Sequence, residues 1–186
     1  FFYFNSSKEE FNKDERPIIP GQKEKNKDDN ELNRLLKEDK KSRDDEYLKK
    51  LTANAKKTFL NSIGMSFAYV KGGYFNAGSY KGDIDESPVH KVDIDPSFLI
   101  SKFEVTQEQY KDIIGINPSK DLGENYPVEN VNFYDAVEFC KKLTEREHKN
   151  SRISEEYCYR LPTEYEWEYA AAGGEKTKLY IYSGSN

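Results

Sequence analysis

The sequence predicts an α+β fold of short strands and short helices joined by long irregular connections. Apolar and polar residues alternate over brief stretches, a pattern typical of half-buried strands. Three later segments each begin with a capping residue and continue with apolar residues at helical spacing. Of the 186 residues, 34% are charged and 14% are aromatic. A chain that is polar on average yet rich in aromatic residues suggests a charged segment beside a separately packed core.

The boundary between these two parts is expected at residue 58. Residues 1–58 carry a net charge of +2 and residues 59–186 a net charge of −7, and 20 of the 26 aromatic residues lie in the second part. We therefore predict a charged, largely disordered or solvated-helix tether over 1–58 and a globular domain over 59–186. The acidic charge of the domain argues against a nucleic-acid partner, because such binding needs a basic surface.

Within the tether, residues 5–30 are expected to be a linker because they hold little apolar surface to offset the entropy of ordering. Apolar residues over 31–60 fall at helical spacing, continuing through Ala55 and Phe59. They predict a solvated helix that docks by a narrow stripe, with a coiled coil as the alternative. The opening Phe1-Phe2-Tyr3-Phe4 fits the end of a signal peptide or membrane anchor, or an arbitrary start in a gene fragment.

The strands are expected at the start of the domain. A strand over 67–70, a Gly72-Gly73 turn and a returning strand at Tyr74-Phe75 predict a hairpin. An acidic loop is expected over 83–87. Residues 89–95 then alternate between two kinds of side chain, which predicts a strand with His90, Val92 and Ile94 on one face and Lys91 and Asp93 on the other. Pro96-Ser97 interrupts this strand, and residues 98–105 form a further apolar run.

Three helices are expected to follow, each opened by a capping box in which the cap side chain accepts a bond from a first-turn N–H. The first should reach about Ile114, and the third should end at Gly173-Gly174. The second should bury a stripe at helical spacing. Little of 117–130 is expected to be regular. The capping pairs are Thr106 with Gln109, Asn132 with Asp135, and Thr163 with Glu166, and the stripe is Ala136, Val137, Cys140 and Leu143.

The sequence contains two cysteines, Cys140 and Cys158, which are candidates for a catalytic or metal-binding role. Two thiolates could bind copper, and the two residues could also form a disulfide. Cys140 lies on the predicted buried stripe, where a free cysteine behaves as a small apolar residue, and Cys158 lies in a predicted strand. We expect structural roles for both. No dinucleotide-binding glycine motif, P-loop or nucleophile elbow occurs in the sequence.

A second group of candidate functional residues consists of Arg160 and three glutamates that follow it closely in the sequence. An acid–base role could be considered, but Glu166 closes a capping box and the first turn of a helix favours anions. Arg160 is therefore expected to pair with one of Glu164, Glu166 and Glu168, or with a backbone carbonyl, and to hold the strand to the helix. Trp167 is expected in the core with the alanines that follow.

The remaining candidates are acidic and histidine residues. Asp83, Asp85 and Glu86 could hold Ca²⁺, but their spacing does not match an EF-hand loop, and a surface loop is the simpler interpretation. His90 is expected to be a satisfied core residue on the face of Val92 and Ile94. His148 is expected near a helix C-terminus, where a partial positive charge is favourable.

Seven blocks of residues, in order, resemble the formylglycine-generating, sulfatase-modifying domain family. The likeness covers residues 58–186, and its most distinctive part is the segment from Arg160 to Ala171. The blocks are Ile63-Gly64-Met65 with Gly72-Gly73 and Phe75, Glu86-x-Pro88-x-His90, Glu104-Val105-Thr106 with Gln109-Tyr110, Asn117-Pro118-Ser119, Pro127-Val128 with Val131, Asp135-Ala136 with Phe139-Cys140, and Arg160-Leu161-Pro162-Thr163-Glu164 with Glu166-Trp167-Glu168-Tyr169.

The resemblance implies a C-type-lectin-like fold of the formylglycine-generating type. It also implies that the chain is truncated, since members of the family continue further. Their second half supplies calcium sites and, in the oxidases, a cysteine pair that binds Cu(I) and oxidises a sulfatase cysteine to formylglycine. By this comparison the present residues supply no catalytic, cofactor-binding or metal-binding site. Copper and calcium would belong to the complete protein.

The sequence leaves two functions open. The complete protein is either a copper-dependent oxidoreductase whose partner is a sulfatase, or a non-catalytic exported module that binds a protein or glycan on the same scaffold. A signal remnant and a charged tether fit a bacterial, extracytoplasmic protein in the periplasm or on the cell surface, with a membrane anchor upstream. A third view is that residues 1–186 alone fold incompletely and expose apolar surface.

Overall fold

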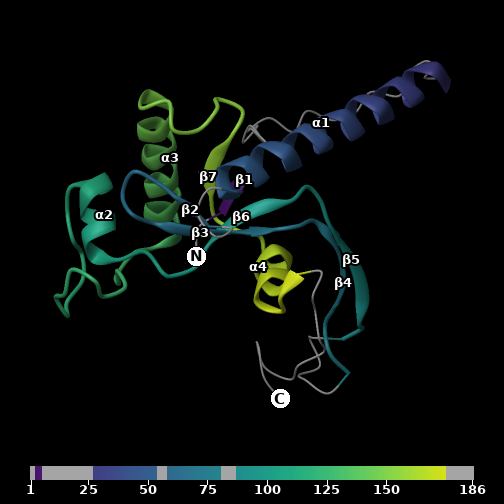
Figure 1. Ribbon diagram of the computed structural model, residues 1–186. Coiled ribbons are helices and arrows are strands. Elements are labelled where there is room, and N and C mark those ends of the chain that lie inside the picture. Colours follow the sequence, from purple (N-terminus) through teal and green to yellow (C-terminus); the bar gives the residue numbers. More distant parts are fainter. Residues whose placement is uncertain (1–2, 6–26, 54–57, 81–86, 175–186) are drawn as a thin grey trace, which may run out of the picture.

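Two antiparallel sheets and four helices form the described part of the structure. Figure 1 shows this structure, a computed structural model in which residues 3–5, 27–53, 58–80 and 87–174 are described. The larger sheet contains, in spatial order, β2 (Thr58–Leu60), β3 (Ser66–Val70), β6 (Phe98–Ser101), β1 (Tyr3–Asn5) and β7 (Cys158–Arg160). The smaller sheet pairs β4 (Gly73–Ala77) with β5 (His90–Ile94).

The helices lie around these sheets as the amphipathic patterns require. They are α1 (Lys27–Ala53), α2 (Gln107–Ile114), α3 (Phe133–Lys149) and α4 (Glu164–Ala171). Helix α3 packs along β7 and against α2, while α4 lies against the β4–β5 hairpin (Figure 1). The three predicted capping boxes of α2, α3 and α4 are confirmed. Residues 117–130 form no regular element, as predicted.

The core is divided between the two sheets. The larger sheet packs against α2 and α3 in the first cluster, where the Phe67 and Tyr159 rings lie 5.6 Å apart at their centroids. The second cluster joins the small sheet to α4 through Tyr169, which is fully buried and whose ring lies 5.5 Å from that of Phe75 at a tilt of 44°. The same cluster includes Phe98 and Ile100 of β6, so α4 packs against both the small sheet and one strand of the larger sheet.

The last three turns of α1 dock on the larger sheet, whereas its earlier turns project away from it (Figure 1). Leu48 is fully buried, and the Tyr47 ring stacks on Tyr157 at 4.4 Å. Tyr157 also donates to the buried Asp44 carboxylate at 2.9 Å. The predicted stripe is present only over the end of the helix, because Leu35 and Leu36, which belong to the predicted stripe, are 51% and 57% exposed. The helix ends at Ala53, and Phe59 lies in a strand. No helix of the described ranges is long and apolar enough to cross a bilayer.

The hairpin predicted between residues 67–70 and 74–75 is wrong. Strand β3 pairs with β2 and β6, and β4 pairs with β5 instead. The chain crosses from one sheet to the other at Gly72, whose N–H donates to Ser97 Oγ at 2.9 Å. A Cβ at Gly72 would lie 2.8 Å from the Ile94 carbonyl oxygen, so the glycine here permits close backbone packing rather than a hairpin turn.

Strand β1 places part of the predicted tether inside the larger sheet. Its residues pair antiparallel with β6 on one side and with β7 on the other. Together with the docked end of α1, it shows that residues before 58 contribute to the packing of the domain. The sequence pattern did not indicate this, because a three-residue strand carries almost no periodic signal. Most of the predicted linker over 5–30 lies outside the described residues.

The buried stripe of α3 differs from the prediction at one position. Cys140 and Leu143 are buried as expected, but Val137 is 38% exposed. Phe139 and Glu147 complete the buried face instead. The helix turns so that residues spaced by three or four from Leu143 face the sheet, and Val137, six residues before it, lies outside that face.

Candidate functional site

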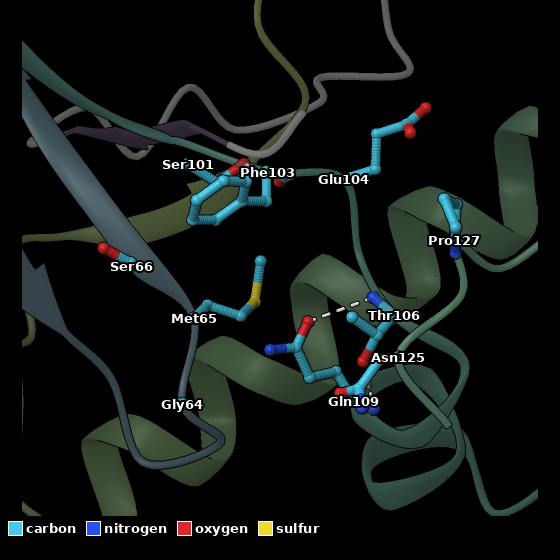
Figure 2. Close-up of a pocket in the computed structure, with 10 residues that line it drawn as sticks. All are labelled: Gly64, Met65, Ser66, Ser101, Phe103, Glu104, Thr106, Gln109, Asn125 and Pro127. Carbon is cyan, nitrogen blue, oxygen red and sulfur yellow. Dashed lines mark hydrogen bonds between the residues drawn. The ribbon is translucent and has the colours of Figure 1, made fainter. Parts of the chain in front are cut away.

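The described residues enclose a hollow of about 330 Å³ between the start of β3, the segment after β6 and the start of α2. Figure 2 shows this site, with Met65 at its floor, the Phe103 ring across from it and Glu104, Gln109 and Asn125 around it. We call this hollow the β6–α2 pocket. Its wall residues come from three separate parts of the chain, 64–66, 101–109 and 125–127.

The turn that precedes β3 forms the floor of the β6–α2 pocket. Gly64 has a φ of +75°, which suits glycine, and it allows the chain to turn into β3. The Asn61 side chain accepts bonds from the N–H groups of Ile63 and Met65, at 3.2 and 2.8 Å. These bonds fix the turn and hold Met65, which is 3% exposed, beneath the opening.

The opposite wall is fixed by the end of β6 and by the loop before α3. Ser101 Oγ donates to the Phe103 carbonyl at 2.9 Å, so the segment leaving β6 curls back on itself. The N–H of Val128 donates to the Val105 carbonyl at 2.9 Å, and this bond holds the 125–128 loop beside the pocket. The wall is therefore rigid at its backbone although Phe103 and Asn125 are exposed.

The polar groups around the β6–α2 pocket are only partly used. The Gln109 amide oxygen accepts from the Thr106 N–H at 3.0 Å, and Figure 2 shows the amide nitrogen turned toward Met65. Neither the Glu104 carboxylate nor the Asn125 amide bonds to another described residue. The Phe103 side chain is 70% exposed. An exposed aromatic ring surrounded by hydrogen-bond donors and acceptors is suited to binding a partner that offers both apolar and polar groups.

The sequence did not point to this site. Residues 98–105 form one apolar run in the sequence, so Phe103 was not identified as a surface residue. The strand ends at Ser101, and the next residues turn outward. The useful signal was the placement of Phe103 next to the acidic Glu104, after a buried run.

The two cysteines lie on packed elements, Cys140 on α3 and Cys158 on β7, and neither is in a disulfide. Burial raises the pKa of the Cys140 thiol far above its ordinary value, and the nearby Cys158 thiolate raises it further. Copper binding needs thiolates. Cys140 is also only 3% exposed within the core of the larger sheet, so the two residues offer no accessible site for Cu(I) and a substrate. Within the described ranges, no three His, Cys, Asp or Glu side chains gather where they could hold a metal ion.

Arg160 forms the predicted clamp between strand and helix. Its guanidinium donates to both carboxylate oxygens of Glu166, at 2.8 and 2.9 Å, and to the Leu161 carbonyl at 3.0 Å. Glu166 also accepts from the Thr163 N–H at 2.8 Å, closing the capping box. The glutamate thus joins β7 to the start of α4. This confirms the structural interpretation of the most distinctive sequence block.

The histidines are both bonded, but only one lies where it was expected. His148 is in the last turn of α3, and its Nε2 donates to the Tyr157 carbonyl at 2.8 Å. His90 is exposed rather than in the core. Its Nδ1 lies 3.0 Å from the Pro88 carbonyl and its Nε2 3.2 Å from the Tyr165 hydroxyl. It begins β5 at the exposed end of that strand, where it contacts Tyr165 of α4.

Trp167 is not in the core, because it is 47% exposed. Helix α4 buries Tyr169, and a residue two positions earlier lies on the opposite side of a helix. The acidic residues Asp83, Asp85 and Glu86 lie outside the described residues.

A buried carboxylate at Glu147 was not predicted. It is fully buried, accepts from the Ser62 N–H at 3.0 Å and from the Tyr159 hydroxyl at 3.5 Å, and lies 4.0 Å from the Arg152 guanidinium. Burial and the Glu147 charge raise the pKa of Tyr159. Its position four residues after Leu143 was the available signal. The carboxylate joins α3 to the turn before β3, which is a structural role.

Comparison with known proteins gives the family. The family profile described as the Sulfatase-modifying factor enzyme 1-like domain matches residues 54–186. Chaperone protein LppX of Paenibacillus barcinonensis is 41% identical over 114 residues, covering 48% of this chain and 41% of that protein. Serine/threonine-protein kinase pkn1 of Chlamydia pneumoniae is 30% identical over 137 residues, covering 60% of this chain and 20% of that protein.

Two solved structures share the fold. Treponema denticola variable protein 1 superposes with a TM-score of 0.57 and 28% identity, over 70% of this chain and 60% of that one. PvdO from Pseudomonas aeruginosa gives a TM-score of 0.51 and 21% identity, over 63% of this chain and 51% of that one. The chain thus spans less than half the length of the two curated relatives. The fold is the C-type-lectin-like fold of the formylglycine-generating type, and the chain belongs to the family of sulfatase-modifying factor enzyme 1-like domains.

Proposed function

We propose that this chain is a polypeptide-binding module built on the sulfatase-modifying scaffold, and that the β6–α2 pocket is its binding surface. The observation that carries the proposal is the exposed Phe103 ring above Met65, beside Glu104 and Asn125, whose side chains bond to no residue that the structure describes. An aromatic anchor surrounded by polar groups is the usual composition of a binding surface.

The names of the curated relatives support a binding role. One relative is named a chaperone protein and the other a protein kinase, and both names describe proteins that act on polypeptides. In this proposal the backbone of a partner bonds to the Asn125 and Gln109 amides while one of its apolar side chains contacts Phe103. In this proposal the protein acts outside the cytoplasm, on or near the bacterial surface, and the charged segment before the domain supports this.

A second candidate is oxidation of a sulfatase cysteine to formylglycine by the complete protein, and the family match favours it. Copper would supply the oxidation chemistry, but the Cys140 sulfur is buried in the core and not accessible to a substrate, so no step of that reaction is assigned to Cys140 or Cys158. In this candidate the present residues position the sulfatase segment and the β6–α2 pocket receives part of it.

One experiment separates the two candidates. The complete protein is mixed with a fluorescent peptide that spans the modified cysteine of a sulfatase, and with the same peptide carrying serine. Binding is followed by fluorescence anisotropy, and aldehyde formation is followed by mass spectrometry. The matched variants are Phe103→Ala in the pocket and Tyr80→Ala, an exposed aromatic residue that does not line the pocket.

The binding module predicts that both peptides bind without conversion and that Phe103→Ala weakens binding about tenfold, the loss expected for one aromatic anchor. Tyr80→Ala should bind like the natural protein. Conversion of the cysteine peptide alone would establish the oxidase. Failure of both peptides to bind, or equal effects of the two substitutions, would contradict the assignment of the pocket.

A further inference from the structure

The first residue of α2 holds one wall of the β6–α2 pocket, although it does not line the pocket itself. Gln107 begins the helix and is 2% exposed. A buried amide is unfavourable unless its polar atoms are bonded, so such a side chain normally has a defined set of partners. The partners of the Gln107 side chain all belong to the irregular segment over 117–127. Two residues of this segment, Asn125 and Pro127, line the pocket.

Every hydrogen-bonding position of the Gln107 side chain is used. Its Oε1 accepts from Asn117 Nδ2 at 2.9 Å and from the Gly123 N–H at 3.1 Å. Its Nε2 donates to the carbonyl oxygens of Asp121 at 2.8 Å and of Pro127 at 3.3 Å. A glutamine amide has two acceptor and two donor positions, so these four bonds satisfy it completely. One side chain thus ties both ends and the middle of the 117–127 segment to the start of α2.

The backbone of the same segment closes the first turn of α2. The Gln107 N–H donates to the Tyr126 carbonyl at 2.9 Å, and the Glu108 N–H donates to the Glu124 carbonyl at 3.1 Å. First-turn N–H groups have no partner within their own helix, so these carbonyls supply the bonds that they need. The segment is therefore attached to α2 by both side chain and main chain, and Asn125 lies between two of the attached residues.

We propose that Gln107 is the positioning residue of the β6–α2 pocket, which keeps the wall formed by Asn125 and Pro127 in place before a partner binds. The inference rests on the proposed function for its effect on binding. Without the amide, the four groups bonded to it lose their partner, and they regain hydrogen bonds with water only if the segment moves away from the helix. The pocket is then complete in only a fraction of the molecules. The apparent dissociation constant rises in inverse proportion to that fraction.

Three variants of the complete protein test this role. Gln107→Met removes the amide, because methionine has a similar length and no hydrogen-bonding group of comparable strength. Asn117→Ala is a milder variant that removes one of the four bonds to Gln107, and its result decides if Gln107→Met does not fold. Arg160→Ala is the matched control, since it breaks an ion pair between β7 and α4 and does not line the pocket. The control separates a local effect on the pocket wall from a general loss of stability.

The first measurement is hydrogen exchange, which needs no partner. The Tyr126 N–H donates to the Gly123 carbonyl and the Val128 N–H donates to the Val105 carbonyl, each at 2.9 Å. Neither N–H group bonds to Gln107, so their exchange becomes faster only if the segment moves. We expect Gln107→Met to speed exchange at both groups by about tenfold or more, while exchange in β3 and α3 stays as in the natural protein.

The other two variants complete the exchange measurement. Asn117→Ala should speed exchange at the same two N–H groups by about threefold, and Arg160→Ala should give no increase confined to them. Unchanged exchange at these groups in Gln107→Met, or an equal increase throughout β3 and α3, would overturn the proposal.

The second measurement is the affinity of each folded protein for the fluorescent sulfatase-derived cysteine peptide, followed by stopped-flow anisotropy. Gln107→Met should bind the peptide about tenfold more weakly, with the loss in the association rate, because fewer molecules hold a complete pocket. Arg160→Ala should bind as the natural protein does. Unchanged affinity in Gln107→Met overturns the proposal even if exchange becomes faster. If the natural protein does not bind the peptide, the proposed function fails, and the exchange result alone decides whether Gln107 sets the pocket wall.

Discussion

Replacing Arg160 with alanine tests whether the most distinctive sequence block is structural. The side chain makes two bonds of 2.8 and 2.9 Å to Glu166, with side-chain exposures of 31% and 13%. A bidentate charge-assisted pair contributes up to about 3 kcal/mol, and partial exposure reduces this. We expect Arg160→Ala to lower the free energy of unfolding by about 1–2 kcal/mol, measured by urea denaturation followed by circular dichroism.

Two matched variants separate geometry from charge. Arg160→Lys keeps the charge but loses the two-pronged contact, so it should recover only part of the loss. Arg34→Ala removes an exposed pair on α1, where the side chains of Arg34 and Glu38 are 63% and 64% exposed and 4.0 Å apart. It should cost less than about 0.5 kcal/mol. The reasoning fails if Arg160→Ala costs no more than Arg34→Ala, or if lysine restores full stability.

Three further predictions concern packing and pH. Gly72→Ala should cost about 1–3 kcal/mol of unfolding free energy, because its Cβ would lie 2.8 Å from a backbone oxygen, and a near-neutral result by urea denaturation would be contradictory. Tyr169→Phe, which loses a 3.1 Å bond to a backbone carbonyl, should cost about 0.5–1.5 kcal/mol, and an unchanged urea midpoint would refute this. Because the pKa of Cys140 is raised above its ordinary 9.0, burial of this thiol contributes stability below pH 9 that is lost at higher pH. At pH 8, Cys158 should therefore react with a thiol reagent well before Cys140, and equal rates would exclude this interpretation.

Local signals in the sequence predicted the helices well. Each capping box depends on residues three positions apart, so Thr106, Asn132 and Thr163 identified the helix starts. Arg160 was also assigned correctly, because its partner lies only six residues away. The family resemblance gave the fold, which a list of short strands could not have given.

Features that depend on distant segments were not predictable in this way. Partner choice for β3 is decided by tertiary packing, so the expected hairpin at 67–75 did not form. Strand β1 is too short to carry a periodic pattern, yet it lies within the sheet. The β6–α2 pocket assembles three separate segments, and Phe103 was hidden in an apolar run. Trp167 was misplaced because composition does not say which face of a short helix is buried.

The most direct test of the proposed binding surface is a photo-crosslinking experiment. Phe103 is replaced by benzoylphenylalanine in the complete protein, and Tyr80 is replaced in the same way as the control. Each protein is irradiated with the sulfatase-derived cysteine peptide, and the crosslinked residue is identified by mass spectrometry. The account predicts a crosslink from position 103 that unlabelled peptide suppresses, and none from position 80. Equal labelling at both positions, or none at position 103, would contradict it.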